Sequence, residues 1–277
     1  MFNAIRPLII ALSFVPGAVL AQAQSDKIDA LYDALNLGEL VEIMRVEGLE
    51  YGASIGADLI GERSTSAEWV GIVDRIYAQE AMETQVRADF GASLETADID
   101  PMLDFFNSPL GQEIISLEIS ARRAFLDEEV EDAATEAAAI ASMDETSRHQ
   151  LLAQYADAND LIESNVVGAL NSNYAFYLGM ADGGAFNGEL TETDMLSAVW
   201  EQEGEIRKST TEWVFAFMTL AYQPLEDADL EAYIAFSQTE AGQNLNTALF
   251  AGFADMFDHI SRALGRGAAH MMSGADL

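Results

Sequence analysis

The segment FFNSPLGQ at residues 105–112 reads as a corner at which one helix ends and the next begins, and FSQTEAGQ at residues 236–243 repeats it. Ser108 suits the position before a first helical turn, because its hydroxyl can accept a hydrogen bond from a backbone N–H of that turn. Pro109 suits the first helical position, where its missing N–H costs nothing. In the second segment Thr239 stands in place of the serine. These residues predict two helix corners of the same kind.

A glycine follows each predicted cap, Gly111 in the first segment and Gly242 in the second. Glycine inside a helix costs about 1 kcal/mol relative to alanine. Its presence at both corners therefore suggests that another helix passes close to this turn. The alternative is that the exposed amides at the start of the helix hold an anion. We expect the glycines to serve packing.

A shift of 131 positions extends the similarity between the two halves of the chain. It takes Trp69 to Trp200, and over residues 94–112 it gives seven identities in 19 positions without a gap. Similarity of this kind predicts two tandem copies of one antiparallel helical unit, residues 24–146 and 147–277. Chance similarity between acidic helices is the alternative. The residues of the predicted repeat motif are Trp69, Phe105, Ser108, Pro109, Gly111 and Gln112 in the first unit and Trp200, Phe236, Thr239, Gly242 and Gln243 in the second.

Upstream of the tryptophans, the alignment of the two halves needs a different shift. A shift of 120 positions matches Val46 and Gly48 to Val166 and Gly168. The second unit should then contain about 11 extra residues, since the shift grows from 120 to 131. We expect them in the Gly- and Asn-rich loop at residues 182–189.

Helical periodicity is the dominant pattern outside the corners. Over residues 41–59, apolar or small side chains recur every three or four positions, which places them on one face of a helix. Further helix starts are predicted at the caps Thr65, Ser147 and Asp227, and one long helix is predicted over residues 109–143. No segment shows the period-two alternation of a strand. The sequence therefore predicts an all-α fold.

The corner at residues 105–112 also carries a family resemblance. With the amphipathic segment before it and the helix after it, it resembles the secreted bacterial helical family catalogued as domain of unknown function 2059. The resemblance covers residues 69–126 best and departs at Glu113, where a basic residue is expected. It implies an all-helical periplasmic or secreted protein without an established activity.

The composition excludes several classes of function. The 277 residues include 47 Asp and Glu but only 13 Lys and Arg, a formal net charge of −34. Nucleic-acid binding is excluded, because it depends largely on basic patches that neutralise phosphates. The chain has no cysteine, which removes thiolate metal sites and cysteine nucleophiles. We find no motif for a cofactor, so none is expected.

Residues 1–23 have the pattern of a secretory signal peptide. Arg6 precedes a short apolar run, and small residues offer cleavage after Ala21 or Ala23. The apolar run is shorter than the roughly 20 residues that a bilayer span needs, so we expect no membrane span in the mature chain. The predicted location is periplasmic or secreted.

The segment Gly52-Ala53-Ser54-Ile55-Gly56 matches the nucleophile elbow of hydrolases. That elbow needs a strand before the serine and a helix after it, whereas both flanks here are predicted to be helical. Gly48, Gly52 and Gly56 recur every fourth residue instead. They are better explained as a small-residue stripe where two helices approach closely.

Other polar residues offer only weak chemical signals. His149 lies four residues after Glu145, and His259 four residues after Asp255, so each pair could supply two metal ligands on one helical face. Neither pair has a third ligand nearby in the sequence. The acidic run over residues 127–136 is best explained as a solvated helix face. No catalytic or metal-binding residue is therefore assigned.

The aromatic residues of the second unit are expected to form its core: Trp213, Phe215, Phe217, Tyr222, Phe250, Phe253 and Phe257. A lipid or peptide groove along Leu249, Phe253 and Phe257 is the alternative. With no credible catalytic constellation, the sequence predicts a non-enzymatic binding or accessory protein whose partner is a protein, a peptide or an apolar ligand. The alternatives are a carboxylate-dependent hydrolase and a peripheral membrane protein.

Overall fold

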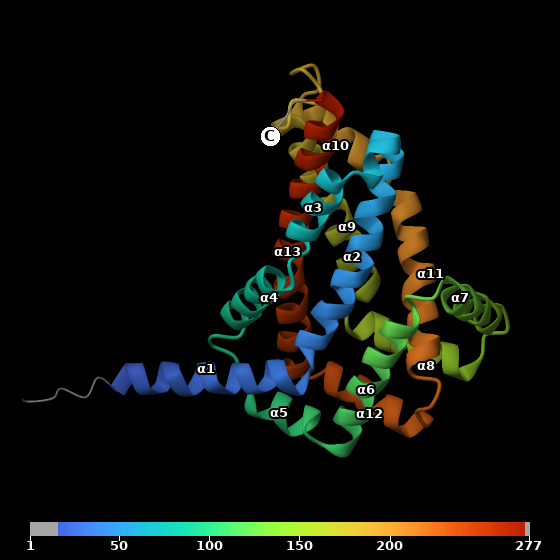
Figure 1. Ribbon diagram of the computed structural model, residues 1–277. Coiled ribbons are helices and arrows are strands. Elements are labelled where there is room, and N and C mark those ends of the chain that lie inside the picture. Colours follow the sequence, from blue (N-terminus) through green and yellow to red (C-terminus); the bar gives the residue numbers. More distant parts are fainter. Residues whose placement is uncertain (1–15, 275–277) are drawn as a thin grey trace, which may run out of the picture.

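A computed structural model describes residues 16–274, and the regular structure in that range is helical, with no strand (Figure 1). The predicted all-α fold is confirmed. The elements are α1 (Pro16–Ala34), α2 (Leu37–Ile60), the 3-10 helix η1 (Gly61–Thr65), α3 (Ala67–Ile76), α4 (Gln79–Ser93), α5 (Asp100–Phe106), α6 (Pro109–Ala124), α7 (Glu128–Met143), α8 (Ser147–Ala158), α9 (Leu161–Asp182), α10 (Glu192–Trp200), α11 (Glu203–Ala221), α12 (Asp227–Ser237) and α13 (Glu240–Ser273).

The helices pack in a reciprocal pattern across the two halves of the chain. α13 packs against α4, and α11 packs against α6, so each half places a helix on the other. The long helices α2, α9, α11 and α13 run alongside one another, and α5 and α12 cross the same end of this bundle (Figure 1). α7 lies on the outside, against α11. We call α1–α6 the first half and α8–α13 the second half.

A single hydrophobic core runs through both halves. Its most completely buried side chains come from the two halves together: Trp69, Tyr32, Phe90, Phe106, Leu94 and Ile114 from the first, and Tyr222, Met218 and Leu230 from the second. Because burial of apolar surface is the main force that stabilises the fold, neither half has a separate core in this arrangement.

The two corners have the same hydrogen bonds at their caps. The Ser108 hydroxyl accepts from the Gly111 amide at 3.1 Å, and the Thr239 hydroxyl accepts from the Gly242 amide at 3.1 Å. A Cβ on either glycine would lie well inside 3.0 Å of the backbone at the end of the preceding helix. The close neighbour is therefore α5 or α12, the helix just before the corner, and not a third helix that crosses it.

The glutamine after each glycine ties its corner to an earlier helix. The Gln112 side-chain amide donates to the carbonyl oxygens of Phe106, at 2.7 Å, and Ala34, at 3.3 Å. The Gln243 side chain donates to the carbonyl oxygens of Ser237 and Ala158, both at 2.7 Å. Ala34 ends α1 and Ala158 ends α8. Each corner thus joins the first and last helices of its half.

The two corners also contact each other. The rings of Phe105 and Phe236 stack with their centroids 4.1 Å apart and their planes at 13°. The shift of 131 positions takes one of these residues to the other. The two predicted corners are therefore in direct contact through residues at the same position of the predicted repeat motif.

The sequence alignment was wrong upstream of the corners. Trp69 is buried in the first turn of α3, whereas Trp200 is the last residue of α10 and is 70% exposed. The two tryptophans are not counterparts. The bonds of the glutamines instead relate Ala34 to Ala158, a shift of 124 positions.

The extra residues of the second half were therefore miscounted and misplaced. The shift grows from 124 to 131, which leaves seven extra residues where about 11 were expected. The starts of α4 and α11 still differ by 124, from Gln79 to Glu203. The additions therefore lie in α11, which has 19 residues against the 15 of α4, and in α12, which has 11 residues against the 7 of α5. They do not lie in the loop at residues 182–189.

Three predicted helix starts need a correction of one residue. Ser66 caps α3 in place of Thr65, and Thr146 caps α8 in place of Ser147. Asp227 is the first residue of α12 and not its cap. In each case a neighbouring residue takes the extended backbone conformation of a cap, which sequence spacing alone does not select.

The long helix predicted over residues 109–143 is two helices. α6 ends at Ala124, and α7 begins at Glu128 after Asp127, whose side chain accepts from the Glu129 amide at 3.0 Å. The buried Phe125 packs at the break against rings of α11. Helix propensity favours continuation here, and tertiary packing overrides it.

The predicted signal peptide lies largely outside the described residues, which begin at Pro16. The rest of it, from Pro16 to Ala23, belongs to α1. In the described part of the chain, no helix is both long and apolar enough to span a bilayer.

Candidate functional site

A partly open cavity of about 960 Å³ lies between the two halves. The first half contributes α2, α5 and α6 to its wall, and the second half contributes α8, α9, α11, α12 and α13. Binding pockets for small molecules range over roughly 300–1,000 Å³. The cavity is therefore large enough for a ligand of drug or lipid size.

The wall of this cavity is mainly apolar. Its larger apolar side chains are Leu35, Leu37, Leu40, Met44, Ile115 and Ile119 from the first half and Leu161, Val167, Trp213, Val214, Phe217, Met218, Leu245, Leu249, Phe250, Phe253 and Phe257 from the second. The predicted stripe of Leu249, Phe253 and Phe257 thus faces the cavity and only partly fills the core. Phe215 differs from the other aromatic residues, because it stacks on His149 at 4.9 Å.

One carboxyl group, that of Glu118, lies deep within this apolar wall. Glu118 is on α6, and the surface that its side chain keeps exposed lines the cavity. Its Oε1 accepts a hydrogen bond from the Tyr222 hydroxyl at 2.6 Å and a longer one from the Tyr233 hydroxyl at 3.3 Å. Burial raises the pKa of Glu118 from 4.5 to about 7, and the two hydrogen bonds oppose this rise. Glu118 therefore changes charge near neutral pH.

Three tyrosines of the second half surround Glu118. Tyr155 comes from α8, Tyr222 from the end of α11 and Tyr233 from α12. The ring of Tyr155 lies 4.8 Å from that of Tyr233 and 5.5 Å from that of Tyr222. Burial raises the pKa of each tyrosine, and the nearby Glu118 carboxylate adds to the rise. The hydroxyls stay protonated and act as hydrogen-bond donors.

The sequence analysis missed Glu118 because it searched for runs and pairs of acidic residues. Glu118 stands alone, with Ile114, Ile115 and Ile119 on the buried face of the same helix. A single carboxylate among isoleucines at helical spacing is itself unusual, because charged groups are almost never buried without a partner. That pattern could have identified it.

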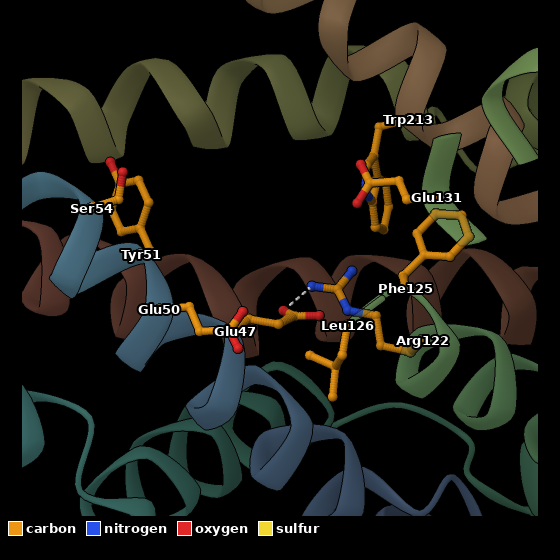
Figure 2. Close-up of a pocket in the computed structure, with 9 residues that line it drawn as sticks. All are labelled: Glu47, Glu50, Tyr51, Ser54, Arg122, Phe125, Leu126, Glu131 and Trp213. Atoms are coloured by element: carbon orange, nitrogen blue, oxygen red, sulfur yellow. Dashed lines mark hydrogen bonds and ion pairs between the residues drawn. The ribbon is translucent and has the colours of Figure 1, made fainter. Parts of the chain in front are cut away.

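A smaller pocket of about 420 Å³ adjoins the cavity and shares Arg122 and Trp213 with its wall. Figure 2 shows the Arg122 side chain pointing at Glu47, with which it forms an ion pair of 2.6 Å. The guanidinium also lies over the Trp213 ring, 4.8 Å from its centroid. The other lining residues are Glu50, Tyr51, Ser54, Phe125, Leu126 and Glu131. The charge of Arg122 is thus already compensated within the protein.

The Gly-x-Ser-x-Gly segment at residues 52–56 lies inside α2, with no strand before it. It therefore lacks the strained turn of a nucleophile elbow. A Cβ on Gly48, Gly52 or Gly56 would collide with side chains of α3 or the residue after it: Tyr77, Val73 and Trp69 respectively. The Trp69 indole N–H also donates to the Gly52 carbonyl at 3.1 Å. These glycines allow α2 and α3 to approach closely.

The histidines and acidic runs do not gather into a site. Within the described residues, no group of three or more acidic or histidine side chains is placed to hold a metal ion. In the acidic run, Asp127 caps α7 and the glutamates after it form the first turn of that helix. His270 lies 3.8 Å from Glu68, in the last turn of α13, at the other end of this helix from its corner.

Comparison with known proteins gives one family match. Residues 80–139 match the model of a family described as "Uncharacterized protein conserved in bacteria (DUF2059)". The matched segment runs from α4 into α7 and includes the first corner and Glu118. The chain matches none of the curated proteins and none of the solved structures with which it was compared.

Proposed function

We propose that this protein is a non-enzymatic binding protein that holds an apolar or amphiphilic molecule in the cavity between its two halves. The observation that carries the proposal is the wall of this cavity, which is apolar over most of its surface and has one deep carboxyl group, that of Glu118. Small-molecule sites typically combine a hydrophobic lining with a few placed polar groups.

An enzyme with paired carboxylates is less well supported. Such a mechanism needs a second carboxyl group close to Glu118. The groups that bond to Glu118 are tyrosine hydroxyls. The other carboxylates of the cavity are the exposed Asp160 and Glu163, and Glu163 pairs with Arg207 at 2.8 Å. These contacts favour binding over hydrolysis.

We also propose that the two halves are copies of one six-helix unit. The support is the shared bonds of the two corners, the reciprocal packing of α13 on α4 and α11 on α6, and the stack of Phe105 on Phe236. The cavity would then lie at the interface between two copies, where later substitutions could shape it without disturbing either copy's fold.

Export is a further part of the proposal. It rests on the signal-peptide pattern of residues 1–23. N-terminal sequencing of the protein recovered from outside the cytoplasm should give a chain that starts after Ala21 or Ala23. A chain that keeps Arg6 at its N-terminal region would contradict export by this route.

A cavity-filling variant tests the binding function. Gly168 of α9 lines the cavity, and a Cβ at this position would meet no atom within 4 Å. Gly168→Leu should fill part of the cavity and should not weaken the fold, because leucine is a better helix former than glycine. The probe is N-phenyl-1-naphthylamine, a neutral dye that fluoresces in apolar sites.

We expect the wild-type protein to bind one dye molecule, and Gly168→Leu to lower the affinity about tenfold or more. Gly204→Leu is the matched control, because Gly204 lies in α11, is exposed and also has open space around it. It should bind the dye as the wild type does. Unchanged binding in Gly168→Leu, or no binding in the wild type, would contradict the proposal.

A further inference from the structure

We propose that the ligand is an amphiphilic amine, whose protonated nitrogen pairs with Glu118 while its apolar part lies along the wall formed by α9 and α13. This inference rests on the proposed function, because it names the class of ligand that the same cavity takes. It follows from the charges and open hydrogen-bonding positions of the cavity.

Among the charged groups that line the cavity, Glu118 is the one that is both withdrawn from solvent and without a cationic partner. Arg122 pairs with Glu47 at 2.6 Å, and Glu163 pairs with Arg207 at 2.8 Å. Asp160 is exposed to solvent. No lysine, arginine or histidine of residues 16–274 forms an ion pair with Glu118, which receives only neutral hydroxyl donors. A buried carboxylate without a compensating cation is costly.

The two oxygens of Glu118 are used differently. Both tyrosine hydroxyls donate to Oε1. The side chain lines the cavity, so Oε2 is available to a group that enters it. A carboxylate can accept about four hydrogen bonds. An ammonium group supplies three hydrogen-bond donors and a positive charge. It can therefore donate to Oε2 and also compensate the negative charge of Glu118.

Other polar head groups fit this site less well. A carboxylate head would be repelled by ionised Glu118, and Arg122, the cation of the wall, is already paired with Glu47. An alcohol could form a hydrogen bond but would leave the charge uncompensated. Charge-assisted hydrogen bonds are roughly twice as strong as neutral ones. The structure therefore favours the amine.

Three probes with the same apolar chain separate these heads: decylammonium, decanol and decanoate, each in competition with the dye at a pH of about 8. We expect decylammonium to bind about tenfold or more tightly than decanol, and decanoate to bind most weakly. Glu118→Gln should lower decylammonium affinity about tenfold and change decanol affinity by less than about threefold.

Glu113→Gln is the matched control, because Glu113 is exposed on the same helix and the substitution removes the same charge. It should leave all three affinities unchanged, which would exclude general attraction of the ammonium to an acidic protein. Equal binding of decylammonium to Glu118→Gln and wild type would overturn the inference while leaving the cavity as a binding site. Tighter binding of decanoate than of decylammonium to the wild-type protein would also overturn the inference. If none of the probes or the dye binds, the proposed function fails as well.

Discussion

The two halves differ in polarity at the faces that they turn toward each other. The shift of 131 positions takes Glu118 of α6 to Leu249 of α13, and Tyr233 of the second half to Met102 of the first. The shift of 124 positions takes Tyr155 to Leu31. Under the proposed duplication, Glu118 and these two tyrosines therefore correspond to two leucines and a methionine.

This difference indicates which of these side chains the fold does not require. Leu31 and Met102 are completely buried, and Leu249 packs against the same core, so the helices pack well with apolar residues at these positions. Replacing a buried polar set with apolar residues of similar size is often neutral or stabilising. We infer that Glu118 and its tyrosines serve binding and not folding.

The largest expected effect comes from the two tryptophans that the sequence alignment paired. Trp69→Ala should destabilise the protein by about 3–5 kcal/mol, because it leaves a large void in the core. Trp200→Ala should cost less than about 0.5 kcal/mol, because its side chain is 70% exposed. Urea unfolding of both variants measures the contrast. Similar losses in both would restore the original pairing of the tryptophans.

Substitution of either corner glycine by alanine should lower the free energy of unfolding by a similar amount. Alanine ordinarily stabilises a helix by about 1 kcal/mol relative to glycine. At Gly111 and Gly242 a Cβ would collide with backbone atoms of the preceding helix, so we expect each substitution to cost about 3 kcal/mol. Gly204→Ala is the control and should be neutral or stabilising, since its surroundings are open. A clear inequality between the two corners would argue against their equivalence.

Glu118, which aligns with an apolar residue in the second half, should make the stability of the protein depend on pH. Its pKa is raised to about 7 in the folded protein from 4.5. The folded state then holds this proton more tightly than the unfolded state, so the contribution of Glu118 to stability is fully present below a pH of about 4.5 and is lost as the pH rises through 7. The loss should be at most about 3 kcal/mol.

Glu118→Gln should remove this part of the pH dependence. The measurement is the difference in unfolding free energy between wild type and variant at several pH values, which cancels the effect of the other carboxylates. The difference should favour the variant increasingly from pH of about 5 to about 8. A difference that does not change with pH would show that Glu118 titrates normally.

The stack of Phe105 on Phe236 should give a smaller, pairwise effect. Stacked aromatic pairs contribute about 0.5–1.5 kcal/mol beyond the area they bury. A double-mutant cycle with Phe105→Leu and Phe236→Leu should therefore give a coupling energy of about 1 kcal/mol. Additive effects would show that the two corners do not stabilise each other through these rings.

The smallest effect should be common to both halves. With a net charge of −34, repulsion between carboxylates should lower the melting temperature at low ionic strength. Salt at about 0.15 M shortens the screening length to about 8 Å, compared with about 30 Å at 0.01 M. We expect the melting temperature to rise by a few degrees between these conditions. No rise would indicate that the carboxylates are too dispersed to interact.

The sequence predicted the features that depend on local chemistry. Helical periodicity identified the fold class, and the caps Ser108 and Thr239 lie where the spacing indicated. The sequence favoured a small-residue stripe at Gly48, Gly52 and Gly56 over a nucleophile elbow, and the structure agrees. The two could be told apart because an elbow needs a strand before its serine, whereas the stripe needs a continuous helix. Errors of one residue arose where adjacent residues could both cap a helix.

The features that depend on three-dimensional packing were not predictable in this way. The break at Phe125 follows from rings of α11 that are distant in sequence. The pairing of Trp69 with Trp200 failed because residue identity says nothing about burial. The environment of the Glu118 carboxyl group is formed by tyrosines that lie 37 to 115 positions away along the chain, from Tyr155 to Tyr233. Only the folded arrangement brings these residues together.

A crystal structure of the protein with decylammonium would test the central claim most directly. The account predicts electron density for the alkyl chain along the cavity wall formed by α9 and α13, with the nitrogen within about 3 Å of a Glu118 oxygen. An empty cavity, a cavity closed by side chains, or a ligand bound elsewhere on the acidic surface would contradict it.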